Sequence, residues 1–150
     1  MSIEFLDFGF LNDYEKSRIA KIPKEVFPLE ENVILDLDIG DEAITIKRNR
    51  KQADQPVIIR EGRTVSFDKL QDAREYLTGL IFPKLNGKKV PSFRNLFSIL
   101  MRDERSEFTD IIKCHDLTKK IPDDLSAHLF LLGFSLEAYK NTLETIKEIE

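Results

Sequence analysis

The chain has 150 residues, a charged share of 33% and a formal net charge of −4. This length is typical of one folding domain, and the acidic balance argues against a general nucleic-acid binder, which usually presents a basic face. The single cysteine, Cys114, excludes an internal disulfide and fits a reducing cytoplasm. The sequence shows neither a secretion signal nor an apolar run of about 18 residues. We therefore expect one cytoplasmic domain with no membrane span.

The first third of the chain predicts a lead-in followed by a β-hairpin. Residues 1–30 are broken by prolines and are expected to form an extended or short-helical segment that covers the core. Residues 33–48 alternate between apolar and polar side chains, which is typical of half-buried strands. A two-residue loop at Gly40-Asp41 would place Leu37 opposite Ile44.

A second, shorter hairpin and a helix are expected next. Val57-Ile58-Ile59 predicts a strand, Glu61-Gly62 a turn, and Thr64-Val65 the returning strand. Apolar residues at helical spacing then follow from 67 to 80, with Asp68 as the expected cap and Gln71 completing a capping box.

The remainder of the chain predicts helices on both sides of one segment whose secondary structure is ambiguous. Pro83 should end the preceding helix, Asn86-Gly87 predicts a turn, and Pro91-Ser92 opens a helix up to Met101. Residues 109–114 are read as a strand or a helical turn, with the strand favoured. A last helical region begins at 122 and is interrupted at Gly133, after which Ser135 is the expected N-cap.

Three groups of residues invite chemical interpretations, and each has a simpler structural one. Adjacent Cys114 and His115 would point to opposite faces of a strand, so packing is favoured over catalysis. Asp36 and Asp38 would share one face of a strand, where a solvated face is favoured over a pair of catalytic carboxylates. The basic run 47–51 reads as a polar loop, and a solvated surface is favoured over a phosphate grip.

Metal and cofactor sites are not expected. His115, His128 and one thiol do not supply the clustered ligands of a zinc site. The sequence also lacks the glycine-rich phosphate-binding and dinucleotide-binding patterns and the Gly-x-Ser-x-Gly pattern of hydrolases. We therefore expect no catalytic residues, no metal and no cofactor.

From residue 56 onward the chain resembles the barstar family of intracellular ribonuclease inhibitors. The likeness rests on Val57–Leu70 as opening strand, turn and start of the first helix, then Phe82-Pro83, Gly87 and an apolar second helix at 93–101. We expect an α+β fold in which a small sheet, made of the N-terminal hairpin and short strands, packs against several helices, and the resemblance implies a barstar-like arrangement from residue 56 onward. Residues 1–55 would be an extension, and 56–150 the family-like region of a single domain.

The resemblance implies an inhibitor or immunity protein that neutralises a toxin or nuclease by occluding its active surface. The expected partner is therefore a protein, rather than a nucleic acid or a membrane. Two surfaces are candidates for binding it: the loop and second helix, and the acidic strand face. Their residues are Lys84, Asn86, Lys88, Lys89, Arg94, Asn95, Ser98 and Arg102 for the first, and Asp36 and Asp38 for the second. The alternative is a nucleic-acid-associated regulator that uses the basic run 47–51.

Overall fold

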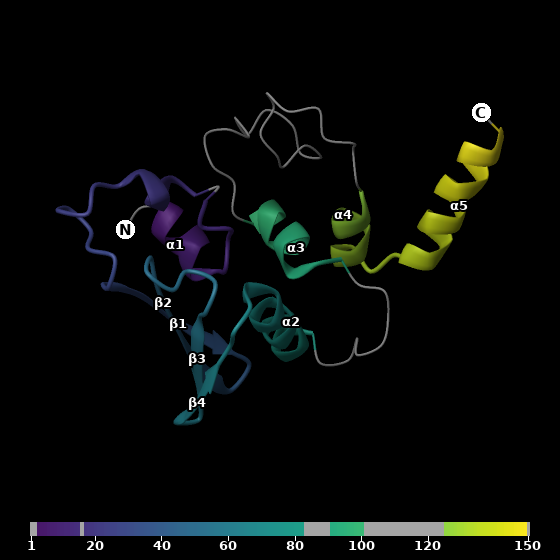
Figure 1. The fold of residues 1–150 in the computed structure, drawn as a ribbon. Helices are drawn as coiled ribbons and strands as arrows, with labels where there is room; N and C mark the ends of the chain where they lie inside the picture. Colours follow the sequence, from purple (N-terminus) through teal and green to yellow (C-terminus); the bar gives the residue numbers. More distant parts are fainter. Residues whose placement is uncertain (1–2, 16, 83–90, 101–124, 150) are drawn as a thin grey trace. The chain divides into compact units, whose positions relative to one another are not determined.

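A computed structural model describes residues 3–15, 17–82, 91–100 and 125–149. Strands and helices occupy separate stretches of the chain, so the predicted α+β class is confirmed (Figure 1). The contacts group the chain into two compact units, Met1–Pro83 and Lys84–Glu150. The division predicted at residue 55 lies inside the first unit, and the single-domain organisation stays a prediction.

The first unit is built on a four-stranded antiparallel sheet with the strand order β1-β2-β3-β4. Both predicted hairpins are therefore present, and they are neighbours in one sheet. The strands are β1 (Asn32–Ile39), β2 (Glu42–Asn49), β3 (Val57–Arg60) and β4 (Arg63–Ser66).

The predicted register of the long hairpin is confirmed. Leu37 pairs with Ile44, and Gly40 in the intervening loop has φ 63°. A positive φ is accessible to glycine at little steric cost, which makes glycine suitable for the first position of this turn. In the short hairpin both loop residues have positive φ, 49° at Glu61 and 74° at Gly62, as a type I′ turn requires.

One face of the sheet forms the core of the first unit. Its buried side chains alternate along the strands, as the period of two predicts: Val33, Leu35, Ile44, Ile46 and Ile58. Helix α1 (Ile3–Gly9) packs closely on this face, because a Cβ at Gly9 would lie 3.3 Å from Leu35 Cδ2. The 3₁₀ helix η1 (Arg18–Lys21) follows and buries Ile19, so the lead-in covers the core as expected.

Helix α2 (Leu70–Ile81) confirms the helix expected after the sheet, but not its predicted cap. The N-cap residue is Lys69, in an extended conformation, and its side chain makes no capping hydrogen bond. Gln71 donates instead to Glu75 one turn further on, at 2.9 Å. The prediction of an Asp68–Gln71 capping box was therefore wrong: the helix begins one residue later than that motif needs.

In the second unit, helix α3 (Phe93–Leu100) begins where Pro91-Ser92 predicted it. The Ser92 hydroxyl accepts a hydrogen bond of 3.2 Å from the Asn95 amide, which is the geometry of an N-cap. The expected turn at Asn86-Gly87 and the segment 109–114 lie outside the described residues.

Helices α4 (Ser126–Leu131) and α5 (Leu136–Ile149) meet at the predicted interruption. Gly133 has φ 81°, and the Phe134 amide donates to Leu129 O at 2.8 Å, which is the Schellman ending of a helix. The Ser135 hydroxyl then accepts from the Ala138 amide at 3.4 Å, so Ser135 begins α5 as expected. Among the described helices, none has the length and apolar character needed to cross a bilayer.

Candidate partner-binding surface

Two arginines of the basic run 47–51, which was expected to form a loop, are buried in the first unit. Residues 47–49 belong to β2, and Arg48 is only 1% exposed. Its guanidinium donates to three backbone carbonyls: Nε to Ala53 O at 2.5 Å, and Nη1 to Phe8 O and Asn12 O at 2.7 Å each. These hydrogen bonds from Nε and Nη1 offset part of the cost of burying the cation.

Arg50 plays a similar part and is 6% exposed. Its Nη1 donates to Phe27 O at 2.6 Å and its Nη2 to Ile22 O at 2.8 Å. Its Nε also donates to the Tyr14 hydroxyl at 3.2 Å, and the guanidinium carbon lies 5.7 Å from the Phe27 ring centroid. The two arginines thus hold the lead-in against the end of β2.

A third arginine holds the lead-in from the side of α2. Arg74 donates twice to Leu11 O, at 2.9 and 2.7 Å, and once to Asp13 at 2.8 Å. Leu11 is fully buried and has φ 63°, a left-handed conformation that costs a non-glycine residue about 1 kcal/mol. The Arg74 hydrogen bonds and the burial of the leucine side chain offset this cost.

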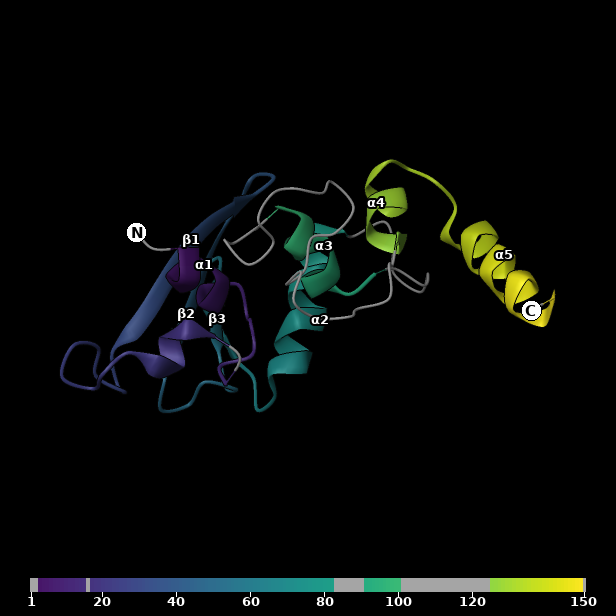
Figure 2. The ribbon, with the colours of Figure 1, turned by 90° about the horizontal axis from the view of Figure 1, so that it is seen from above.

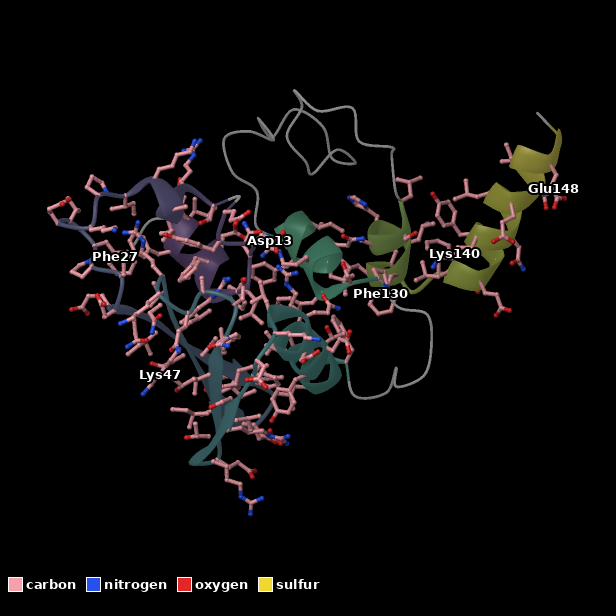
Figure 3. The ribbon with its side chains drawn as sticks, in the orientation of Figure 1. Asp13, Phe27, Lys47, Phe130, Lys140 and Glu148 are labelled. Atoms are coloured by element: carbon pink, nitrogen blue, oxygen red, sulfur yellow. The ribbon has the colours of Figure 1, made fainter. Side chains whose placement is uncertain are left out.

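These contacts change the interpretation of residues 47–51. The prediction of a solvated loop was wrong for the two arginines, whose charges point into the protein. The lysines differ from them: Lys51 is exposed and bonds to Glu30 at 3.3 Å, and Lys47 extends away from the sheet in Figure 3. The hydrogen bond to Lys51 lowers the pKa of the Glu30 carboxyl. The first unit therefore presents fewer cations to solvent than its sequence suggests.

The second face of the sheet, here called the outer face, carries the side chains that alternate with the core. On β1 these include Ile34, which is 53% exposed, and the exposed Asp36 and Asp38. Asp36 accepts a hydrogen bond of 2.5 Å from the Thr45 hydroxyl on β2. The neighbouring pairs are Ile34 with Lys47 and Asp38 with Ala43. The outer face is therefore largely polar on β1 and β2, whereas β3 adds the half-buried Val57 and Ile59.

An ion pair joins β2 to β3 near the turn of the long hairpin. Arg60 Nε and Nη2 donate to the Glu42 carboxylate at 2.5 and 2.7 Å, a bidentate geometry. Hydrogen bonding to Arg60 lowers the pKa of the Glu42 carboxyl. The same contact, with a smaller contribution from Tyr76, raises the pKa of Arg60.

The structure brings the two predicted aspartates together on one strand face, but it describes only part of the other predicted surface. Arg94 is half-buried and Asn95 is exposed, both on α3. The Ser98 side chain lies outside the described residues, as do Lys84, Asn86, Lys88, Lys89 and Arg102. His128 lies in α4, and Cys114 and His115 fall outside the described range. The described residues form no group of three or more His, Cys, Asp or Glu side chains suited to a metal ion.

The structural roles of Arg48, Arg50 and Arg74 were missed from the sequence. One signal was available for Arg48, which continues the inward alternation of Ile44 and Ile46 by two residues. On a strand, that parity places its side chain on the core face. No comparable pattern marks Arg74, whose partners lie about sixty residues earlier in the chain.

The chain matches no protein-family model, no curated protein and no solved structure. The resemblance to the barstar family therefore stays a prediction.

Proposed function

We propose that this protein binds a protein partner, a toxin or nuclease, and inhibits it by covering the partner's active surface. The observation that carries the proposal is the open, carboxylate-bearing outer face of the sheet. It is a preformed surface on a regular element, so little ordering of the chain would oppose binding. Inhibition of this kind needs only steric occlusion and charge complementarity, without a reacting group on the inhibitor.

The charge distribution favours a basic partner. Arg48 and Arg50 direct their charges inward, whereas Asp36 and Asp38 face outward. The net charge of −4 acts in the same direction at longer range. Enzymes that act on nucleic acids present basic surfaces to phosphates, and an acidic patch is complementary to such a surface.

The loop and second helix remain part of the proposal as a second contact region. Arg94 and Asn95 are its described members, and the sequence resemblance is what supports it. A charged helix next to a basic loop would suit an acidic part of the partner. The outer face, with Asp36 and Asp38, is the stronger candidate because its geometry is described in full.

The nucleic-acid alternative has lost its main support. A phosphate-binding site needs exposed cations. Two of the cations in residues 47–51, Arg48 and Arg50, instead donate hydrogen bonds to backbone carbonyls in the first unit. Lys47 and Lys51 are what remains of the basic run at the surface, and Lys51 is paired with Glu30.

Capture followed by co-expression tests the proposal. The tagged chain is used to isolate proteins from extracts of its source cell, and each captured protein is then expressed in a test host alone and with the chain. We expect one captured protein to stop growth when expressed alone and growth to return when the chain is present. Growth that is unaffected by the chain, for every captured protein, would contradict the proposal.

A further inference from the structure

Among the described residues, the sheet of the first unit ends in a long strand, β1, that is paired on one side only. β1 has eight residues and is the first strand in the order β1-β2-β3-β4, so within the described part of the chain no strand pairs with its other side. Figure 2 shows the β1–β2 hairpin, in blue, along the margin of this unit. An unpaired edge presents a row of backbone donors and acceptors that another chain can use.

The register identifies which backbone groups these are. Ile39 and Glu42 flank the two-residue loop and form its closing, hydrogen-bonded pair. Hydrogen-bonded and non-hydrogen-bonded pairs alternate along an antiparallel ladder. The N–H and C=O groups of Ile34, Asp36 and Asp38 therefore point away from β2. Within the described residues, the backbone hydrogen bonds outside the helices and strands involve none of these groups.

The same three residues place their side chains on the outer face. The residues that offer unpaired backbone groups are therefore also the ones that carry the two carboxylates. A strand added to β1 would set its own outward side chains directly opposite Ile34, Asp36 and Asp38. Opposite charges across such a pair stabilise it, and like charges destabilise it. The added strand should therefore carry Lys or Arg at alternate positions.

A second copy of the chain fits this edge less well than a basic strand, because β1 carries no lysine or arginine to lie opposite Asp36 or Asp38. Two-fold antiparallel pairing centred on Asp36 places that residue opposite its own copy, and a shift of one residue towards the turn places Asp36 opposite Asp38. Both arrangements bring carboxylates face to face. Charge complementarity thus favours a basic strand over self-association.

We propose that β1 is a docking edge for an extended basic segment of the partner, which joins the sheet as an additional antiparallel strand. This inference rests on the proposed function, because it names how that partner is held. Backbone hydrogen bonds would supply much of the affinity, and the two aspartates would select alternating cations.

A peptide titration followed by NMR tests the edge directly. The probe is a seven-residue peptide of alternating Lys and Val with blocked ends, added to the full ¹⁵N-labelled chain at low salt. We expect the amide signals of Ile34, Asp36 and Asp38 to shift and their hydrogen exchange to slow. The same peptide N-methylated at every residue has no backbone N–H to donate on either edge, so it should shift nothing. Absence of shifts in β1, or equal shifts with the methylated peptide, would overturn the proposal.

Two variants separate the contributions of backbone and charge. Ile34→Pro removes one edge N–H and keeps both aspartates and the bonds to β2, whereas Thr64→Pro makes the same change on the opposite edge strand, β4. We expect Ile34→Pro to abolish the shifts and Thr64→Pro to leave them unchanged. The double variant Asp36→Lys/Asp38→Lys keeps every backbone N–H of β1 and reverses the two charges. It should weaken peptide binding by roughly tenfold or more. Binding that survives charge reversal unchanged would contradict the role of the aspartates.

The captured partner distinguishes this inference from the proposed function. If the partner is inhibited equally by the natural chain and by the Asp36→Lys/Asp38→Lys variant, the edge inference fails and the proposed function stands. If the peptide binds β1 but no captured protein is neutralised, the proposed function fails and the edge is a peptide-binding site of another role.

Discussion

The guanidinium carbon of Arg48 lies 4.1 Å from the centroid of the Phe8 ring, and Nη1 of the same side chain donates to the Phe8 carbonyl oxygen. Phe8 is in the last turn of α1, where backbone carbonyls lack partners within the helix and the helix dipole is negative. A cation from β2 thus satisfies the end of α1 and holds the lead-in on the sheet. Arg48, a member of the basic run 47–51, therefore stabilises the fold of the first unit.

Replacing Arg48 should destabilise the protein strongly. Arg48→Met keeps much of the side-chain volume but removes the Arg48 hydrogen bonds to the carbonyls of Asn12 and Ala53, and leaves Phe8 O with the Leu11 amide as its donor. Buried acceptors left unsatisfied cost about 1–3 kcal/mol each, so we expect a loss of about 3 kcal/mol or more in the free energy of unfolding. Urea denaturation followed by circular dichroism measures it.

Lys47→Met provides the matched control, because it removes the same charge from the adjacent residue on the outer face. Its effect should stay within about 0.5 kcal/mol, as for most surface substitutions. Equal losses for the two variants would show that Arg48 contributes no more than its surface neighbour.

Two glycine substitutions should change stability in opposite directions. Gly62 has φ 74°, so Gly62→Ala forces an alanine into the left-handed region and should cost about 1 kcal/mol. Gly79 lies within α2 with nothing within 4 Å of an added Cβ, so Gly79→Ala should stabilise the protein by up to about 1 kcal/mol. Thermal unfolding of both variants checks the signs, and a stabilising Gly62→Ala would contradict the turn geometry.

The Glu42–Arg60 pair should make stability depend on pH in the acidic range. Arg60 lowers the Glu42 pKa below its ordinary value of 4.5. A carboxyl whose pKa is lower when folded stabilises the protein above its unfolded pKa, and this contribution disappears as the pH falls through the folded pKa. The stability lost in Glu42→Gln should thus be largest near neutrality and shrink below pH 4.5.

An Arg60→Met background tests the cause of this pH dependence. Without the guanidinium, Glu42→Gln should have nearly the same small effect at neutral and acidic pH. Guanidinium-chloride denaturation would screen the pair, so urea is the denaturant to use. An unchanged pH dependence in that background would assign the effect to another group.

The chain should not bind nucleic acid through residues 47–51. Fluorescence anisotropy with a labelled duplex at low salt should show no association, because Arg48 and Arg50 are buried. Binding that weakens steeply with rising salt and is lost in Lys47→Ala/Lys51→Ala would instead restore the nucleic-acid alternative.

Local patterns predicted much of this fold from the sequence. The hairpin register followed from alternation and a glycine turn, the start of α3 followed from Pro91-Ser92, and the cap at Ser135 followed from residue type and position. These features depend on residues close together in the chain. The cap of α2 was mispredicted because Asp68 and Gln71 met the pattern of a capping box one residue before the helix begins.

Long-range contacts account for what the sequence did not reveal. Arg48 and Arg50 occur in a stretch that reads as solvated, and their carbonyl partners belong to residues 8–27 and 53. Backbone carbonyls exist at every residue, so no residue type marks them as partners. Of the candidate surface, the pairing of Asp36 and Asp38 on one face was predictable from strand periodicity. The open edge beside them was not, because it depends on the strand order.

A titration of enzymatic activity tests the central claim most directly. The rate of the purified, captured toxin or nuclease is measured on its own substrate as the chain is added. We predict a linear fall to near zero at one chain per partner, and a marked weakening with Asp36→Lys/Asp38→Lys. Full activity in the presence of a stable complex would contradict the account, because it would show that the bound surface leaves the active site open.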